Sequence, residues 1–266
     1  MLPKLFQYGS FFIPTYGVLV ALAFLAGLWI TVRLAREKGL NAEDVTNLAI
    51  YCALSGLLGA KLFMFLFNYR EYLADPRSIL TLSTLQAAGV YQGGFLLALA
   101  TAIVYMRKVR LPAFTTLDVF SPGIALGHAI GRLGCLAAGC CWGQECHLPW
   151  AITFRNRQAN DLTGVPLDVP LHPTQLYESL AEAIIFVYLY RRIKKPHAEG
   201  EMFGLYLILY STVRFAVEFV RNHEQSTHLG LSLTQWISLA TLAAGIWLMA
   251  RRKQHGQHKT LSTVPL

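Results

Sequence analysis

GHAIGRLGCLAAGCCWG, residues 127 to 143, combines features that are typical of a functional site inside a membrane. It is an apolar run that carries one arginine, Arg132, between glycines, and it ends in closely spaced cysteines. An ionisable side chain is costly within a membrane helix, so its presence indicates a function. The neighbouring glycines allow a second backbone or a lipid headgroup to approach closely.

The composition of the whole chain agrees with a membrane setting. Of its 266 residues, 54% are apolar and only 14% are charged, and the mean hydropathy is +0.41. Soluble domains carry about 25% charged residues, so we expect a polytopic membrane protein. The net charge of +8 does not indicate nucleic-acid binding, because the basic residues gather at the ends of apolar segments. Five cysteines are too few for a disulfide scaffold.

Seven segments are apolar enough and long enough to cross a bilayer, which needs about 20 residues. We expect spans at residues 13–32, 45–67, 89–106, 117–137, 173–190, 202–220 and 231–250, and a short amphipathic surface helix at residues 77–86. The first segment has no basic start, so we interpret it as a retained span and not as a signal peptide. The predicted fold class is all-α: a polytopic helical bundle with seven transmembrane helices. It forms a single domain over residues 1–255, with a loop at 139–171 and a tail at 256–266.

The basic residues predict the orientation of this bundle. Most lysines and arginines follow the first, third, fifth and seventh segments. The positive-inside rule makes those ends cytoplasmic. The N-terminus and the loop at 139–171 are then outside, and the C-terminal tail is cytoplasmic.

The remaining charges lie within or beside the spans. Arg214, Glu218 and Arg221 are spaced i, i+4 and i+7, so one carboxylate can orient two guanidiniums on one helix face. A guanidinium grips phosphate through paired hydrogen bonds, and these arginines with Arg132 indicate a phospholipid headgroup site. The alternative is that they form helix-packing ion pairs or extend to the membrane surface.

A second dense polar patch is LHPTQLYE, residues 171 to 178. It places His172 at a helix cap position and Gln175, Tyr177 and Glu178 at the start of the fifth span. The alternative is interfacial anchoring. Weaker signals come from Tyr16 in the first span and from glycine pairs in spans, which are usually packing contacts.

Several segments in this order resemble the prolipoprotein diacylglyceryl transferase family of bacterial inner membranes. They are Tyr16-Gly17, Gly59-Ala-Lys61, Gln92-Gly93-Gly94, Asp118 with Pro122, the Arg132 segment to Trp142-Gly143, His172 to Glu178 and Tyr210 to Arg221. The resemblance implies transfer of the diacylglyceryl group of phosphatidylglycerol to the lipobox cysteine of preprolipoprotein signal peptides, with release of glycerol 1-phosphate. It implies a multi-pass protein of the bacterial cytoplasmic membrane, and we expect no metal or cofactor.

The resemblance also assigns roles to residues. Arg132 and Arg214 would stabilise the leaving phosphate, with Glu218 holding Arg214 and with Tyr210 as a further catalytic group. The expected substrate-binding residues are Arg132, Gly143, Tyr16, Lys61, Gln92, Gly93, Gly94, His172, Gln175, Tyr177, Glu178 and Arg221.

This chain departs from the family pattern at several positions. Gln92 replaces the usual histidine, a candidate base for the thiol, and Lys61 replaces an arginine. Cys135, Ala138 and Cys140 replace polar residues of the family signature. Two alternatives therefore stay open: a divergent relative that uses another acceptor, and a non-enzymatic protein that handles thiols or metals.

The cysteines that follow Arg132 allow four interpretations. Their spacing, C-x4-C-C-x4-C, is not a usual zinc pattern. A disulfide could join Cys140 or Cys141 to Cys146, or the thiols could be reduced and structural. A metal or redox site and a catalytic thiol are the other possibilities. Cys52, in the middle of a span, is interpreted as an apolar packing residue.

Overall fold

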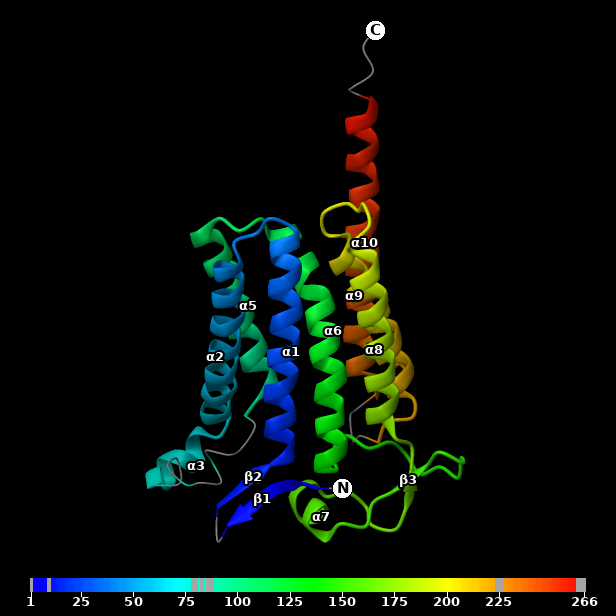
Figure 1. The fold of residues 1–266 in the computed structure, drawn as a ribbon. Helices are drawn as coiled ribbons and strands as arrows, with labels where there is room; N and C mark the ends of the chain where they lie inside the picture. Colours follow the sequence, from blue (N-terminus) through cyan, green and yellow to red (C-terminus); the bar gives the residue numbers. More distant parts are fainter. Residues whose placement is uncertain are drawn as a thin grey trace. The chain divides into compact units, whose positions relative to one another are not determined.

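Figure 1 shows the computed structural model, which describes residues 2–8, 11–77, 81, 84, 89–222 and 227–261. These residues contain seven helices of at least 18 residues, and two short helices lie between them. The long ones are α1 (Thr15–Glu37), α2 (Ala42–Phe67), α5 (Tyr91–Val109), α6 (Ala113–Ala138), α8 (Thr174–Arg192), α9 (Glu201–Glu218) and α10 (Leu233–Leu261). The short ones are α3 (Tyr69–Ala74) and α7 (Arg157–Thr163).

Each predicted apolar segment coincides with one long helix, which confirms the mainly helical class. Four described helices qualify as candidate membrane spans by length and apolarity: α1, α2, α6 and residues 233–251 of α10. Helices α8 and α9 carry several charged side chains, and Glu178, Glu182 and Glu218 among them are buried within the protein. The count of seven spans and their orientation stay predictions.

Three short antiparallel hairpins were not part of the all-α prediction. They pair β1 (Lys4–Tyr8) with β2 (Phe11–Pro14), β3 (Ile152–Thr153) with β4 (Pro170–Leu171), and β5 (Thr227–His228) with β6 (Leu231–Ser232). Strands of two to five residues leave almost no alternating pattern in the sequence, which explains why they were missed. The predicted surface helix at residues 77–86 falls mostly outside the described residues.

The chain divides into two compact units, residues 1–34 with 117–266 and residues 35–116. In the first unit, α1 and α6 touch at a pair of glycines. A Cβ atom on Gly123 would lie 2.6 Å from the carbonyl oxygen of Gly27, and one on Gly27 would lie 2.7 Å from that of Gly123. Only glycine allows backbones to approach so closely.

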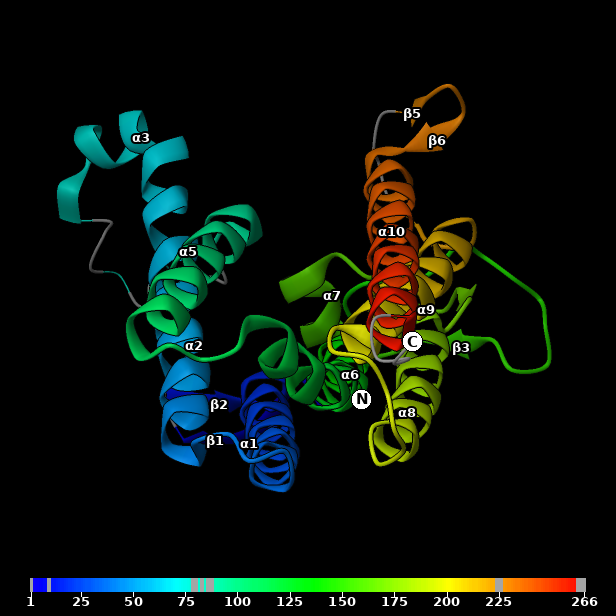
Figure 2. The ribbon, with the colours of Figure 1, turned by 90° about the horizontal axis from the view of Figure 1, so that it is seen from above.

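A carboxylate from α6 fixes the start of α9 in the same unit. Asp118 is 2% exposed, and its Oδ2 and Oδ1 accept hydrogen bonds from the backbone N–H of Gly200 at 2.6 Å and of Phe203 at 2.9 Å. Free N–H groups at a helix start favour a negative charge. Helix α9 in turn packs against α8 and α10 (Figure 2).

The segment between α6 and α8 is held by its own small core. Phe154, Ala159, Val165 and Leu171 are buried there together. Within the first unit, this segment and the N-terminal hairpin lie at one end of the helices, and the C-terminal end of α10 lies at the other end (Figure 1). Residues far apart in sequence therefore meet at the end where α6 finishes and α8 begins.

In the second unit, α2 and α5 pack along glycines. A Cβ atom on Gly59 would lie 2.4 Å from the carbonyl oxygen of Gly93, and one on Gly93 would lie 2.5 Å from that of Gly59. A Cβ on Gly94 would lie 2.8 Å from the carbonyl oxygen of Gly56. Gly93 and Gly94 are thus packing contacts, while their expected role in substrate binding stays a prediction.

Candidate functional site

The end of α6, the start of α8 and the residues after α9 bring three charged side chains together. Arg132 Nη2 lies 2.5 Å from Glu178 Oε2, and Arg221 Nη1 lies 3.4 Å from Glu178 Oε1. The Glu178 side chain is 3% exposed, and those of Arg132 and Arg221 are 13% and 17% exposed. Two guanidiniums therefore share one buried carboxylate, and we call this group the arginine–carboxylate cluster.

The start of α8 is fixed against the chain that follows α6. Gln175 Nε2 donates to the carbonyl oxygen of Cys140, and Thr174 Oγ1 donates to that of Cys141, each at 2.6 Å. One turn later, Ser179 Oγ donates to the carbonyl oxygen of Ala129 at 2.8 Å. These bonds join residues that lie 33 to 50 positions apart in the sequence, and they set the position of Glu178 opposite Arg132.

Gly143 lies beside this cluster in close contact with two other segments. Its N–H donates to the carbonyl oxygen of His172 at 3.0 Å, and it forms an antiparallel bridge with Arg221. A Cβ atom at Gly143 would lie 2.5 Å from Cβ of His172 and 2.6 Å from the carbonyl oxygen of Val220. The backbone next to Arg221 is therefore held by a position that accepts only glycine.

His172 and Tyr177 form a small hydrogen-bonded group at the start of α8. His172 Nδ1 and the Tyr177 hydroxyl are 3.2 Å apart, and Trp150 Nε1 donates to that hydroxyl at 2.7 Å. Both predicted substrate-binding residues are half-buried. They lie in the same loop and helix start that carry Gly143 and Glu178.

A second ion pair lies on α9. Arg214 Nη1 is 2.6 Å from Glu218 Oε2, and the side chains are 12% and 1% exposed. The predicted contact between Glu218 and Arg214 is therefore present. The predicted contact of Glu218 with Arg221 was wrong, because α9 ends at Glu218 and Arg221 turns to Glu178.

Two residues that were not predicted support Glu218 from the start of α10. Ser232 Oγ donates to Glu218 Oε1 at 2.9 Å. The N–H of Ser232 donates to Gln235 Oε1 at 2.9 Å, and the N–H of Gln235 donates to Ser232 Oγ at 3.2 Å. This reciprocal pair is a capping box at the start of α10, and the spacing Ser-x-x-Gln would have revealed it.

Tyr210, the predicted catalytic tyrosine, lies in a cluster of rings. Its ring centroid is 5.5 Å from that of His128 and 5.7 Å from that of Tyr206. His128 Nδ1 is also 3.3 Å from Glu182 Oε1, and Glu182 is 1% exposed. The His128–Glu182 pair links α6 to α8 one turn beyond Glu178 and was not predicted.

Buried polar side-chain atoms remain without a hydrogen bond in and near the arginine–carboxylate cluster. Among the described residues, neither Arg132 Nε nor Gln175 Oε1 has a hydrogen-bond partner. A buried donor without a partner costs about 1–3 kcal/mol. A ligand that brings oxygen atoms to this place would remove the cost at Arg132.

The other predicted residues are distributed over both units. Tyr16 is the second residue of α1 and is 42% exposed, and a Cβ on Gly134 would lie 3.3 Å from its ring. Lys61 lies on α2 and donates from Nζ to the carbonyl oxygen of Thr84 at 2.7 Å. Gln92 is exposed at the start of α5. Lys61, Gln92, Gly93 and Gly94 belong to the second unit, whereas the arginine–carboxylate cluster belongs to the first.

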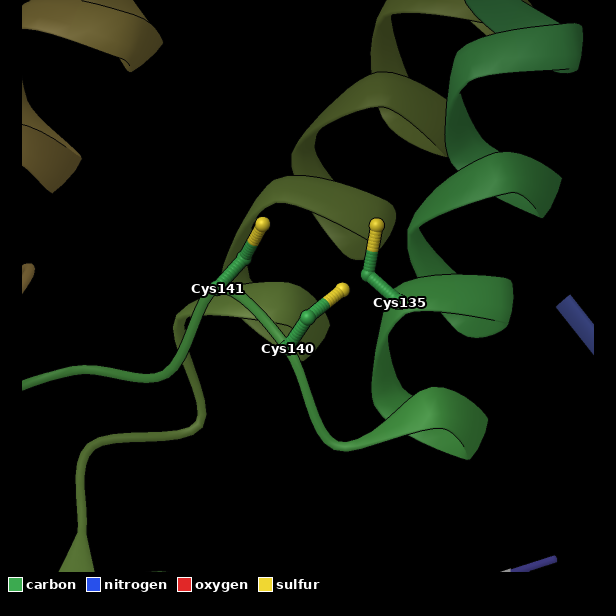
Figure 3. A group of neighbouring side chains, drawn as sticks. All are labelled: Cys135, Cys140 and Cys141. Carbon is green, nitrogen blue, oxygen red and sulfur yellow. The ribbon is translucent and has the colours of Figure 1, made fainter. Parts of the chain in front are cut away.

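Three cysteines gather beside the cluster (Figure 3). The Sγ atoms of Cys135, Cys140 and Cys141 lie within 4.8 Å of one another. Arg132 Nη1 is 4.0 Å from Cys135 Sγ. Cys146 is buried elsewhere, and all five cysteines are free, so the structure does not contain the disulfide considered between Cys140 or Cys141 and Cys146.

The surroundings shift the pKa values of the Cys140 and Cys141 thiols in opposite directions. Hydrogen bonds from Cys135 and then Cys140 lower the pKa of the Cys141 thiol, and Arg221 and Arg132 act in the same direction. The hydrogen bond to Cys135 raises the pKa of the Cys140 thiol. The positive charges of Arg221 and Arg132 favour a thiolate at Cys141.

Comparison with known proteins identifies a family. The family described as prolipoprotein diacylglyceryl transferase matches residues 3–251. A relative from Methylobacillus flagellatus is 34% identical over 258 residues, covering 93% of this chain and 95% of that protein. Relatives from Clostridium tetani and Vibrio vulnificus are 31% and 32% identical, cover 93% and 98% of this chain, and are themselves covered to 96% and 95%. All three are named phosphatidylglycerol–prolipoprotein diacylglyceryl transferase. The chain belongs to the prolipoprotein diacylglyceryl transferase family.

Proposed function

We propose that this protein transfers the diacylglyceryl group of phosphatidylglycerol to the lipobox cysteine of preprolipoproteins, and that it releases glycerol 1-phosphate. Its family and the names of its relatives support this reaction. The observation that carries the proposal is Arg132, a buried guanidinium whose Nε has no partner among the described residues. A second guanidinium, Arg221, shares its carboxylate.

The charges of the arginine–carboxylate cluster suit a phosphate. Two cations share one anion, and an uncompensated buried charge is unfavourable. A phosphodiester brings one negative charge, and its oxygen atoms can accept hydrogen bonds from the N–H groups of Arg132. The same contacts strengthen as the bond between glyceryl carbon and phosphate oxygen breaks, because negative charge then grows on the leaving phosphate.

Arg214 is proposed as the second group that stabilises the leaving phosphate. Glu218 and Ser232 fix its guanidinium through the 2.6 Å ion pair and the 2.9 Å hydrogen bond. Tyr210 lies one turn before Arg214 on the same helix and is proposed as a further catalytic group. A side chain held by buried partners needs little reorganisation when charge develops.

The remaining expected contacts are assigned to the two substrates. They are Tyr16, Lys61, Gln92, Gly93, Gly94, Gly143, His172, Gln175, Tyr177 and Glu178. The acceptor reacts as its thiolate, and Gln92 cannot take the thiol proton. We therefore infer that this chain activates the thiol by a route other than a base at residue 92.

We also propose the membrane setting that the basic residues indicate. The protein spans the bacterial cytoplasmic membrane seven times as a single domain over residues 1–255. The N-terminus and the loop at 139–171 lie outside, and the tail at 256–266 lies in the cytoplasm. The loop and the C-terminal end of α10 lie at opposite ends of the helices of the first unit (Figure 1), which supports placing them on opposite sides of the membrane.

The test uses purified protein with phosphatidylglycerol labelled in its acyl chains and a lipobox peptide. We expect labelled peptide and released glycerol 1-phosphate, and no label on a peptide with serine in place of cysteine. Arg214→Ala should lose transfer. Arg192→Ala is the control and should keep it, because Arg192 is the last residue of α8, at the opposite end of that helix from Glu178. A folded wild-type protein that labels no peptide and does not rescue a transferase-depleted strain would overturn the proposal. Label that leaves the lipid for a different molecule would indicate another acceptor.

A further inference from the structure

Cys135, Cys140 and Cys141 come from two adjoining pieces of chain, and we call them the cysteine triad. Cys135 lies in the last turn of α6, and the other two follow directly after the helix. In Figure 3 the three side chains extend toward one common region, and their Sγ atoms lie within 4.8 Å of one another. Cys135 is buried, and the other two are half-buried.

The backbone that carries the triad is held from several sides. Cys141 has a φ of 62°, a left-handed value that is unfavourable for a residue with a side chain. The carbonyl oxygens of Cys140 and Cys141 accept the 2.6 Å hydrogen bonds from Gln175 and Thr174, which are both 0% exposed. This turn is thus fixed by buried partners on α8, as metal ligands are fixed by the groups behind them.

We propose that the cysteine triad binds one thiophilic metal ion, Zn²⁺ in the first instance, through three thiolates. A Zn–S bond is about 2.3 Å long, so sulfurs around one tetrahedral ion lie about 3.8 Å apart. The observed Sγ–Sγ distances are at most 4.8 Å. They would therefore have to shorten by at most about 1 Å, which small side-chain rotations provide. Arg132, with Nη1 at 4.0 Å from Cys135 Sγ, brings positive charge next to the anionic sulfurs.

Three protein ligands leave one position of a tetrahedral zinc ion open, which is the arrangement of catalytic zinc sites. We propose that this position takes the acceptor thiol, an extension that rests on the proposed function. The incoming thiol displaces a bound water, its S–H bond breaks, its proton goes to solvent, and a Zn–S bond forms. The acceptor is then held as a thiolate beside Arg132. Binding to the zinc ion thus activates the thiol, which Gln92 cannot do.

The experiment measures metal binding without turnover. Full-length protein, purified in detergent under reducing conditions, is made metal-free and titrated with Zn²⁺ and with Co²⁺, whose thiolate charge-transfer absorption reports the ligands. We expect about one ion per chain and an absorption band of cobalt bound to thiolates. Adding a lipobox peptide should change this band, and the same peptide with serine should not. The absence of stoichiometric binding or of the thiolate band in the wild-type protein would overturn the site.

Matched variants locate the ligands. Cys140→Ser and Cys141→Ser should each lose stoichiometric binding, while Cys52→Ser and Cys146→Ser should keep it. Equal loss in Cys146→Ser, or binding that survives the double change C140S/C141S, would refute the triad as ligand set. Equal responses to the cysteine and serine peptides would refute the open position for the acceptor. A protein that binds metal and peptide in this way but transfers no lipid would overturn the proposed function and leave the metal site standing.

Discussion

Glu178 is the residue whose removal tests the arginine–carboxylate cluster most directly. The change Glu178→Gln keeps the size and shape of the side chain and removes its charge. Arg132 and Arg221 then face each other without the carboxylate that now lies 2.5 Å and 3.4 Å from them. An amide cannot neutralise either guanidinium, and its NH2 group adds donors where acceptors are needed.

The expected magnitude follows from these distances and from burial. At an effective dielectric of about 20, the two contacts amount to roughly 7 and 5 kcal/mol of gross attraction. Desolvation cancels much of this, and removing one member of a buried ion pair typically costs about 3–5 kcal/mol. We take the lower end, about 3 kcal/mol, because both arginines keep some exposure. For a chain of this size that lowers the unfolding midpoint by roughly 6–12 °C.

The assay is thermal unfolding of purified protein in detergent, followed by the rate of lipid transfer. Glu201→Gln is the matched control, since Glu201 pairs with Arg192 but the two side chains are 17% and 28% exposed. Its unfolding free energy should fall by less than that of Glu178→Gln, because Glu201 pairs with one arginine and Glu178 with two. If Glu178→Gln shifts the midpoint no more than Glu201→Gln and leaves the transfer rate unchanged, the cluster has neither the structural nor the catalytic role that we assign to it.

Three further outcomes are expected. Arg132→Lys keeps the charge but loses Nε and the planar fork, so transfer should fall roughly 10- to 100-fold; a near-normal rate would contradict phosphate binding by Arg132. Gly93→Ala would place Cβ 2.3 Å from Phe63 Cγ and should lower the free energy of unfolding by about 1–3 kcal/mol. Gly131→Ala is its control, because a Cβ there meets no other part of the described chain within 4 Å beyond its own helix backbone, and equal midpoints would refute the packing role. Gln92→His adds a base and should raise thiol transfer above about pH 6.5, where histidine is neutral; an unchanged pH–rate profile would show that residue 92 is not near the thiol.

The helices of this protein follow from local features of the sequence. A run of apolar residues must satisfy its own backbone hydrogen bonds in a membrane, and the helix is the arrangement that does so within one segment. The predicted segments therefore coincide with the seven long helices. The sequence also identifies Arg132, Glu178, Arg214 and Glu218 as candidate site residues, because they lie in segments that resemble those of the family in the same order.

The partners of these charges could not be predicted in the same way. The i, i+7 relation between Arg214 and Arg221 assumes a continuous helix, but α9 ends at Glu218. Arg221 then forms a backbone bridge with Gly143 and pairs with Glu178, which lies 43 residues away in sequence. Helical spacing determines neighbours only within one helix, whereas a contact across such a separation depends on how the helices pack.

For the cysteines too, some features follow from the sequence and others depend on the tertiary structure. Sequence alone determined that they are close together along the chain and near Arg132. Only the tertiary structure decided that Cys135, Cys140 and Cys141 form a group and that Cys146 lies apart from it. The turn after α6 reverses direction at Gly139 and Cys141, both with positive φ, and buried side chains of α8 hold it there. Gly139 ends α6 through local backbone hydrogen bonds that glycine readily allows, whereas the positive φ of Cys141 is unfavourable for a residue with a side chain and depends on the tertiary partners from α8.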